Sequence, residues 1–240
     1  MKKYFAIIAL STGLISSPAF AHTNHVEEPE VDAGKIHIHN ISAGNFDDDD
    51  SFGNELELEY GVNDWLGVKL AHVMGGHEGE DYDWYTGGEV AVKFELLQEG
   101  EYRPATSIQT SYDWHAQSEH PENIGVMGIF RKNIGPTNNL LNVKLSHNIG
   151  ENSEGGIDFD AAARSVYEFS HDYAIGAEYF GEFGQIDDME EFNQQGHQLG
   201  PIVTFAPFEN VHMHGSLAYL FGISEEAPDG TLKLEVGFEL

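Results

Sequence analysis

Apolar and polar residues alternate along most of this chain, and that period of two limits it to β-structure. Residues 54 to 72 read NELELEYGVNDWLGVKLAH, with apolar side chains at every second position before and after Asn63-Asp64. The pattern predicts a β-hairpin with one apolar and one polar face. Such a sheet belongs either to a soluble sandwich, whose apolar faces share a core, or to a membrane barrel, whose polar face lies inside.

Segments of this kind recur to the last residue, and we predict twelve strands from them. The expected spans are 35–45, 54–61, 65–74, 88–97, 103–115, 122–132, 138–149, 159–170, 173–185, 197–206, 211–222 and 230–240. Short turns alternate with longer acidic loops such as FDDDDSFG and IDDMEEFNQQG. Outer-membrane barrels have short periplasmic turns and longer external loops, and their tilted strands cross the bilayer in about 9 to 11 residues.

The two faces of these strands differ in charge. With the apolar face against lipid, the opposite face brings most of the basic side chains together with many carboxylates. The residues expected to line the lumen and set its selectivity are Glu55, Glu57, Glu59, Lys69, Glu89, Lys93, Glu95, Arg131, Lys144, Arg164, Glu178, Glu182 and Lys233. Aromatic residues near strand ends, including Tyr60, Trp65 and Trp114, match the girdles of membrane barrels.

The predicted fold is therefore all-β: a single closed antiparallel transmembrane β-barrel of about 12 strands, with short periplasmic turns and acidic extracellular loops. A soluble periplasmic barrel or sandwich is the alternative. It would give the aromatic strand ends no special role.

The first residues, MKKYFAIIALSTGLISSPAFA, combine two lysines, an apolar stretch and a small-x-small ending, which is typical of a secretory signal peptide. We therefore expect a cleaved signal peptide at 1–21, a His- and acid-rich periplasmic segment at 22–34, and the outer-membrane barrel at 35–240. The expected location is the outer membrane of a Gram-negative bacterium. Cysteine is absent, so we expect no disulfide or thiol chemistry.

The chain is strongly acidic, with 11 Lys and Arg against 41 Asp and Glu and a formal net charge of -30. Such a field repels phosphate, so nucleic acid is not an expected partner, and an acidic outer rim would gather cations. The run Asp47–Asp50 lacks the residue order of an EF-hand loop and does not predict a specific calcium site. The G-x-S-x-G motif is absent, and we predict no catalytic residues and no enzyme activity.

Four stretches carry a resemblance to a known family: EYGVNDWLGVKL, GGEVAVKFELLQEGEYRPATSIQTSYDW, YAIGAEYFGEFG and GPIVTFAPFENVHMHGSLAYLFGISEEAPDGTLKLEVGFEL. Over residues 54 to 240 the chain resembles the outer-membrane β-barrel proteins grouped with the MetA pathway of phenol degradation, which are transporter-like. The resemblance implies an outer-membrane protein that passes or binds small organic molecules. It supplies no catalytic residues.

The last strand, TLKLEVGFEL, resembles the signal by which the barrel-assembly machinery recognises outer-membrane barrels. It ends on Leu240, where that signal has an aromatic residue. The expected partners are therefore outer-membrane lipid and lipopolysaccharide, the assembly machinery, and a small-molecule or cation substrate.

Histidine is frequent, with 13 residues, and two pairs stand at i and i+2, a spacing that puts both rings on one face of a strand. These four are expected to point inward near the periplasmic ends of the first and eleventh strands, beside carboxylates of the twelfth. Because imidazole suits zinc and copper, we hypothesise a divalent transition-metal site made of His37, His39, His212, His214, Glu235 and Glu239. About 10 Å, or two strand spacings, separates the two pairs, so one ion would need a Glu or water to bridge them. The alternative is that the histidines are polar lumen residues that titrate.

The sequence thus predicts an outer-membrane channel or binding barrel for passive uptake or export of small neutral or cationic molecules, aromatic ones included. Twelve strands leave a narrow lumen once side chains fill it. A His-rich outer-membrane protein that handles copper or zinc is the second hypothesis, and a structural or adhesive barrel is the third. His22 and His25, in the acidic start of the mature chain, could bind copper or zinc too, and the alternative there is a disordered acidic segment.

Overall fold

The computed structural model describes residues 25–46, 51–77, 83–116, 120–150, 153, 155–208 and 212–240. The expected signal peptide, His22 and the run Asp47–Asp50 lie outside the described residues. Among the described residues, no helix is long and apolar enough to cross a membrane.

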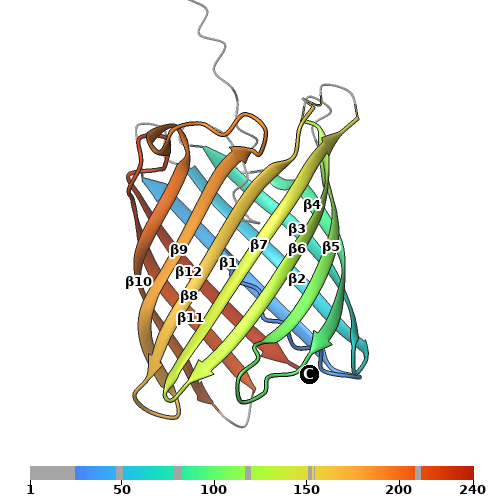
Figure 1. The fold of residues 1–240 in the computed structure, drawn as a ribbon, viewed down its shortest axis with the longest axis vertical. Coiled ribbons are helices and arrows are strands. Elements are labelled where there is room, and N and C mark those ends of the chain that lie inside the picture. The colour runs from blue at the N-terminus through green and yellow to red at the C-terminus, as the bar shows by residue number, and fades with distance from the viewer. Residues whose placement is uncertain are drawn as a thin grey trace, which may run out of the picture.

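Twelve antiparallel strands in these ranges form one closed barrel (Figure 1). They are β1 Ile36–Phe46, β2 Ser51–Asn63, β3 Leu66–His77, β4 Asp83–Leu97, β5 Ala105–His115, β6 Glu122–Ile134, β7 Thr137–Ile149, β8 Asp158–Glu168, β9 Tyr173–Gln185, β10 Gly196–Phe208, β11 Met213–Gly222 and β12 Gly230–Glu239. A 3-10 turn, η1, spans Phe192–Gln194. Each strand pairs with its neighbours in the chain, and β12 pairs with β1 to close the ring. The predicted fold and strand number are confirmed. β4 begins before the predicted residue 88 because Asp83 pairs with Gly75 beyond an irregularity in the β3 register.

The two faces of the barrel wall have opposite character. On β2, Leu56 and Leu58 are exposed on the outside, at 44% and 45%, whereas Glu55 and Glu57 point inward and are 1% and 3% exposed. A soluble protein would bury the leucines and expose the carboxylates. The wall therefore has its apolar face outside and its charged face in the lumen, as in a membrane barrel and unlike a sandwich.

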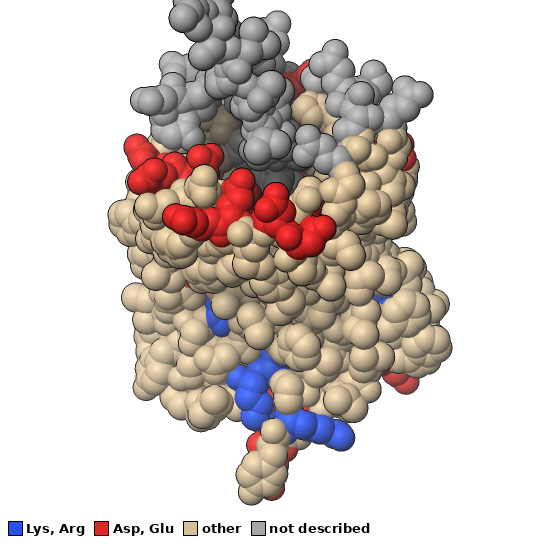
Figure 2. All heavy atoms as spheres, turned by 45° about the horizontal axis from the view of Figure 1, so that its top comes forward, with Lys and Arg blue, Asp and Glu red and all other residues tan. Residues whose placement is uncertain are grey.

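The two rims differ in the length of their connections (Figure 1). At the rim near the C-terminus, called here the short-turn rim, Gly135 and Pro136 join β6 to β7, and Gly135 adopts a φ of 59° that suits glycine. The opposite, long-loop rim has connections such as residues 186–195 between β9 and β10. Figure 2 shows a row of Asp and Glu side chains along the long-loop rim, with Lys and Arg visible toward the other end. Parts of the predicted acidic loops lie outside the described residues.

Aromatic side chains lie on the outer surface near both rims. At the short-turn rim, Trp65 is 53% exposed and stacks on Phe94 with ring centroids 6.2 Å apart. Toward the other rim, Trp114 donates a hydrogen bond from Nε1 to the Tyr85 hydroxyl at 2.7 Å. Amphipathic rings at both ends of the apolar band are what two membrane interfaces require.

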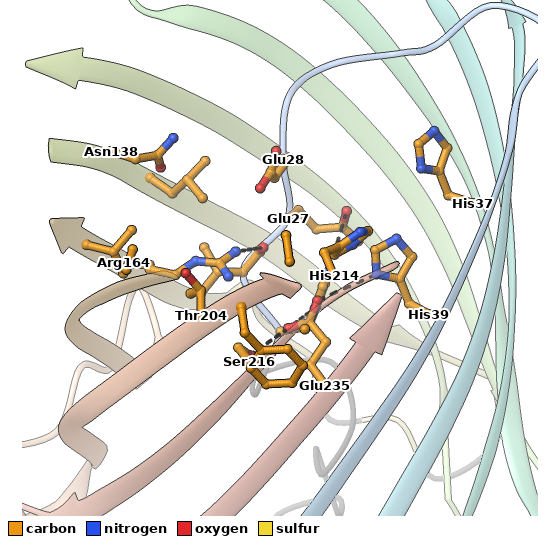
Figure 3. A pocket seen from close by; sticks show the side chains of 18 of the residues that line it. Glu27, Glu28, His37, His39, Asn138, Arg164, Thr204, His214, Ser216 and Glu235 are labelled. Atoms are coloured by element: carbon orange, nitrogen blue, oxygen red, sulfur yellow. Dashed lines mark hydrogen bonds and ion pairs between the residues drawn. The ribbon is translucent and has the colours of Figure 1, made fainter. Parts of the chain in front are cut away.

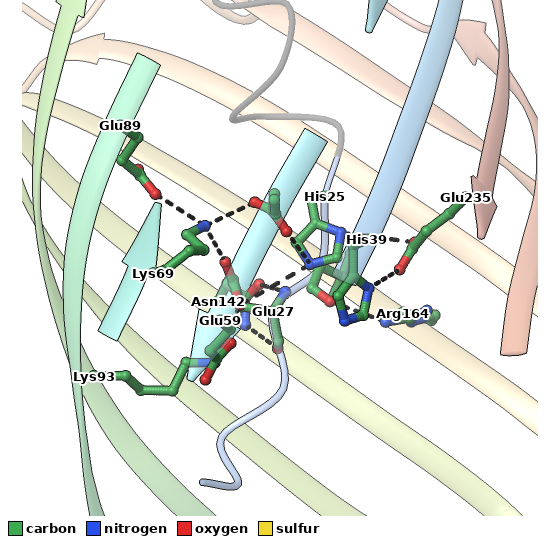
Figure 4. Close-up of polar contacts among 12 residues, drawn as sticks. His25, Glu27, His39, Glu59, Lys69, Glu89, Lys93, Asn142, Arg164 and Glu235 are labelled. Carbon is green, nitrogen blue, oxygen red and sulfur yellow. Dashed lines mark hydrogen bonds and ion pairs between the residues drawn. The ribbon is translucent and has the colours of Figure 1, made fainter. Parts of the chain in front are cut away.

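Residues 25–34, which we call the inner segment, lie inside the barrel and lead into β1 (Figures 1 and 4). Val26 and Glu27 are 1% and 5% exposed. Val26 packs among inward-facing apolar residues of four strands, Leu140, Ala162, Phe180 and Leu220. The sequence predicts a His- and acid-rich periplasmic segment at 22–34. The described part of this segment lies in the lumen, where its charges meet those of the wall.

The inner segment reaches the short-turn rim at the end of β2. Ala33 forms a parallel bridge with Gly61, and the Gly34 N–H donates to the Gly61 carbonyl at 2.7 Å. A Cβ at position 61 would collide with the Asp32 carbonyl oxygen, so the absence of a side chain lets the segment come this close. Gly34, with a φ of 79°, then turns the chain into β1.

Candidate functional site

Buried ion pairs join the inner segment to the barrel wall (Figure 4). Glu27 reaches two lysines: its Oε1 lies 2.6 Å from Lys69 Nζ on β3, and its Oε2 lies 3.3 Å from Lys93 Nζ on β4. Lys69 also lies 2.8 Å from Glu57 and 2.9 Å from Glu89. Lys93 also lies 3.0 Å from Glu59 of β2. Each lysine is therefore shared between the segment and the wall, as buried charges require.

Hydrogen bonds hold the backbone of the inner segment against the other side of the lumen. Asn142 of β7 accepts from the Glu27 N–H at 2.7 Å and donates from Nδ2 to the Glu27 carbonyl at 3.0 Å. Arg164 of β8 donates from Nη2 to the Val26 carbonyl at 2.9 Å. A single short segment thus contacts β3, β4, β7 and β8.

These neighbours set the charge of the inner segment. Burial alone would raise the pKa of Glu27, but Lys69 and Lys93 outweigh it and hold that pKa well below its usual range. Burial lowers the pKa of His25, whereas Glu235 and Glu57 raise it, and the result is a pKa of about 9. The inner segment therefore carries one carboxylate paired with lysines and one imidazole surrounded by carboxylates.

The predicted lumen residues all lie on inward-facing positions of their strands. Arg131 pairs with Glu30 of the inner segment, with Nη2 2.5 Å from Oε1. Lys233 Nζ lies 2.6 Å from Glu178 Oε2, and neither side chain has exposed surface. Basic and acidic groups are therefore interleaved on the inner face, and their effect on ion selectivity stays a prediction.

Three imidazoles and one carboxylate meet near the short-turn end of the lumen (Figures 3 and 4). Glu235 of β12 lies between two of them: its Oε1 is 3.5 Å from His39 Nδ1, and its Oε2 is 3.6 Å from His25 Nδ1. The ring centroids of His39 and His214 are 5.2 Å apart, and those of His25 and His39 are 6.0 Å apart. We call His25, His39, His214 and Glu235 the lumen histidine site.

The structure divides the six residues of the hypothesised metal site between two places. His39, His214 and Glu235 meet in the lumen histidine site, whereas His37, His212 and Glu239 lie at the short-turn rim with Asp32. His37 stacks with His39, with ring centroids 6.4 Å apart, so the two places adjoin. At the rim, His37 Nε2 is 3.2 Å from Asp32 Oδ2 and His212 Nδ1 is 3.9 Å from Glu239 Oε1. Lys35 Nζ lies 2.9 Å from the same Glu239 oxygen, which leaves less negative charge for a cation.

The rings of His39 and His214 come closer than the expected separation of about 10 Å. The reason is that β12, the strand between them, has a glycine at the position between the two side chains. Gly237 pairs with His39 of β1 on one side and with His214 of β11 on the other. A Cβ on Gly237 would collide with the His214 ring, so the ring lies over the glycine and approaches His39. The glycine was visible in the sequence, but its position between the two histidines depends on the strand register.

His25 is the member of this site that the sequence did not place. The sequence predicts a periplasmic segment at this position, and the period of the strands says nothing about where His25 lies relative to the lumen. The sequence feature that points to a place inside the barrel is charge. Residues 25–34 contain several acids and no Lys or Arg, while the lumen wall contains buried lysines that need acidic partners.

The inner segment separates two cavities in the lumen. One, of about 390 Å³, lies toward the short-turn rim and is lined by His39, Arg164 and His214 among others. The second, of about 30 Å³, is lined by residues that include Lys144 and Asp160. His25 lines both cavities, so the segment stands between them.

No family model and no curated protein matches the chain. Among solved structures, the COG4313 outer membrane channel from Pseudomonas putida F1 has a TM-score of 0.66 at 11% sequence identity, covering 90% of this chain and 100% of that one. The NanC porin has a TM-score of 0.57 at 8% identity, covering 85% of this chain and 100% of that one. At these identities the similarity shows the fold, which is that of outer-membrane barrels.

Proposed function

We propose that this barrel is an outer-membrane channel for small neutral or cationic molecules, with the inner segment as its constriction. The observation that carries the proposal is the charged lumen, which the inner segment narrows between two cavities. The apolar outer face supports a membrane setting. The two similar structures, described as a channel and a porin, support passage of small molecules.

The proposed location is the outer membrane, reached after export by the N-terminal signal peptide. Lipid and lipopolysaccharide would contact the apolar band, and the barrel-assembly machinery would recognise β12. Membership of the group associated with the MetA pathway of phenol degradation is part of the same proposal, and it rests on the sequence resemblance.

The preference for cations over anions follows from the balance of charge. Exposed acids such as Asp187, Glu190 and Glu225 at the long-loop rim raise the local concentration of cations. Within the lumen, the inner segment adds Glu27, Glu28 and further acids without adding Lys or Arg. A cavity of about 390 Å³ admits only a small molecule.

Single-channel recording in a planar bilayer with a salt gradient tests the proposal. We expect small, cation-selective steps from the wild type. Glu27→Ala removes the carboxylate that binds Lys69 and Lys93, so the inner segment should loosen and the steps should grow by about twofold or more, with a weaker cation preference. Glu101→Ala makes the same change at an exposed residue between β4 and β5 and should leave conductance as in the wild type.

Silence from protein that is folded, as judged by heat-modifiable gel migration, would contradict the channel and favour a structural or adhesive barrel. Anion-selective steps would contradict the proposed substrate charge. Equal conductance in the wild type and Glu27→Ala would show that the inner segment is not the constriction.

A further inference from the structure

The larger cavity has a wall whose composition follows from strand register. One row of paired residues crosses five strands there, and its members all line the cavity. In ring order they are Glu168 of β8, Ala174 of β9, Thr204 of β10, Ser216 of β11 and Glu235 of β12. Figure 3 shows Thr204, Ser216 and Glu235 along one side of the cavity. Residues paired across strands have Cβ atoms about 5 Å apart, so the row forms a strip with a carboxylate at each end.

Apolar side chains lie next to this row at its β8 end. Val166 is two residues before Glu168 and shares its inner face, about 7 Å farther from the short-turn rim. Leu140 of β7 is a diagonal neighbour of Val166, because it pairs with Arg164. Both side chains are buried, and together with Ala174 they line the cavity. A carbon skeleton in contact with this apolar wall would have its polar end beside Glu168.

Lys93 and Arg164, which also line the cavity, already have acidic partners. Lys93 Nζ lies 3.3 Å from Glu27 and 3.0 Å from Glu59. Arg164 Nε lies 3.8 Å from Glu178. These partners offset the positive charge that would otherwise repel a cation from the cavity.

Two carboxylates at the mouth of the cavity lack a basic partner of this kind. They belong to Glu168, at the end of β8, and to Asp172, in the short turn before β9, and within the described part of the chain neither forms an ion pair with Lys or Arg. Asp172 Oδ1 lies 3.9 Å from Nδ1 of His171, whose side chain is 82% exposed. Glu235, at the other end of the row, already faces two imidazoles. Negative charge without compensation therefore gathers at the β8–β9 side of the mouth, where cations collect.

From this arrangement we propose that the larger cavity binds small organic ammonium ions. The ammonium group lies at Glu168 and Asp172, and the carbon skeleton lies against Leu140, Val166 and Ala174. A cavity of about 390 Å³ is large enough for an ion such as benzylammonium. The proposal names a substrate class for the channel proposed above and rests on that function for its part in transport, whereas binding is measured without conduction.

Fluorine NMR titration of the tag-free barrel, refolded in detergent, with 4-fluorobenzylammonium chloride tests the site. We expect saturable binding of one ion per chain. The double variant Glu168→Gln/Asp172→Asn should weaken binding by about fivefold or more, because it removes two partly screened ion pairs. Glu101→Gln removes an exposed carboxylate outside the cavity at the same rim and should bind as the wild type does.

Two further ligands separate the contribution of charge from that of the apolar wall. The neutral 4-fluorobenzyl alcohol should bind about fivefold more weakly or worse, since it cannot form the ion pairs. Methylammonium keeps the charge and lacks the ring, so it should displace the fluorinated ion only at about tenfold higher concentration or more.

The proposal would be overturned by the absence of saturable binding, or by unchanged binding in the folded double variant. Equal affinity for the ammonium ion and the alcohol would also overturn it, because the carboxylates would then have no part in recognition. A barrel that binds the ion as expected but conducts nothing would support the site and contradict the channel. A barrel that conducts cations without binding the ion would support the channel and contradict the site.

Discussion

At the scale of single residues, the lumen depends on charges that have no access to bulk water. Lys233 has no exposed side-chain surface, and its Nζ lies 2.6 Å from Glu178 Oε2 and 5.0 Å from the centroid of the Phe180 ring. Arg164 Nε lies 3.8 Å from the other oxygen of Glu178. A buried pair of this kind adds little net stability, but the loss of one partner leaves a buried charge without compensation.

Replacing Lys233 by methionine should therefore destabilise the barrel strongly. We expect Lys233→Met to lower the free energy of unfolding by about 3–5 kcal/mol, because Glu178 stays buried with one cation fewer. The double variant Lys233→Met/Glu178→Gln should recover much of this loss, because the two residues are coupled. Urea unfolding in lipid vesicles measures both values.

Lys132→Met is the matched control for that experiment. Lys132 lies 3.1 Å from Glu99 in a partly exposed pair near the short-turn rim. Its loss should cost no more than about 1 kcal/mol, as for other solvent-screened pairs. An equal cost for Lys132→Met and Lys233→Met would contradict the role assigned to burial.

At the scale of elements, the inner segment depends on its close approach to β2. Gly61 provides that approach, because a side chain there would collide with the Asp32 carbonyl oxygen. Val31, next to this contact, is 7% exposed, and its N–H donates to Glu95 Oε2 at 2.9 Å. A methyl group at position 61 should displace the segment from the wall.

Cysteine labelling can measure that displacement, because the chain has no cysteine of its own. In the Val31→Cys background we expect slow reaction with a maleimide, and Gly61→Ala should speed it by about tenfold, since local opening governs access to a buried group. Gly128→Ala is the control, because its Cβ would meet only the flexible side chain of Phe130. Equal rates in the Gly61→Ala and Gly128→Ala backgrounds would show that the segment does not depend on Gly61.

The strands could be predicted from the sequence and the inner segment could not, for one physical reason. A bilayer outside and charged groups inside impose a period of two on each strand, and that period is local. The contacts of Glu27 with Lys69, Lys93 and Asn142 join residues far apart in the chain, and no local pattern encodes them. The inward direction of His39 and His214 was predictable, whereas their meeting across Gly237 required the register.

At the scale of the whole molecule, the inner segment connects walls that face each other. Lys69 belongs to β3 and Arg164 to β8, which stand far apart in the ring order, and Glu235 belongs to β12, at the seam with β1. Residues 25–27 contact all three. The lumen is therefore lined by charged side chains of the strands and is also crossed by fixed contacts between opposite walls.

Those contacts have a mechanical consequence. A ring of hydrogen-bonded strands resists stretching around its circumference, but it flattens into an ellipse at little cost because no strand pairing breaks. The inner segment acts as a tie across the diameter, since flattening that lengthens the distance between β3 and β8 would pull Glu27 from Lys69 or Val26 from Arg164. This barrel is thus braced from within against such flattening, by a stretch of chain that belongs to no strand.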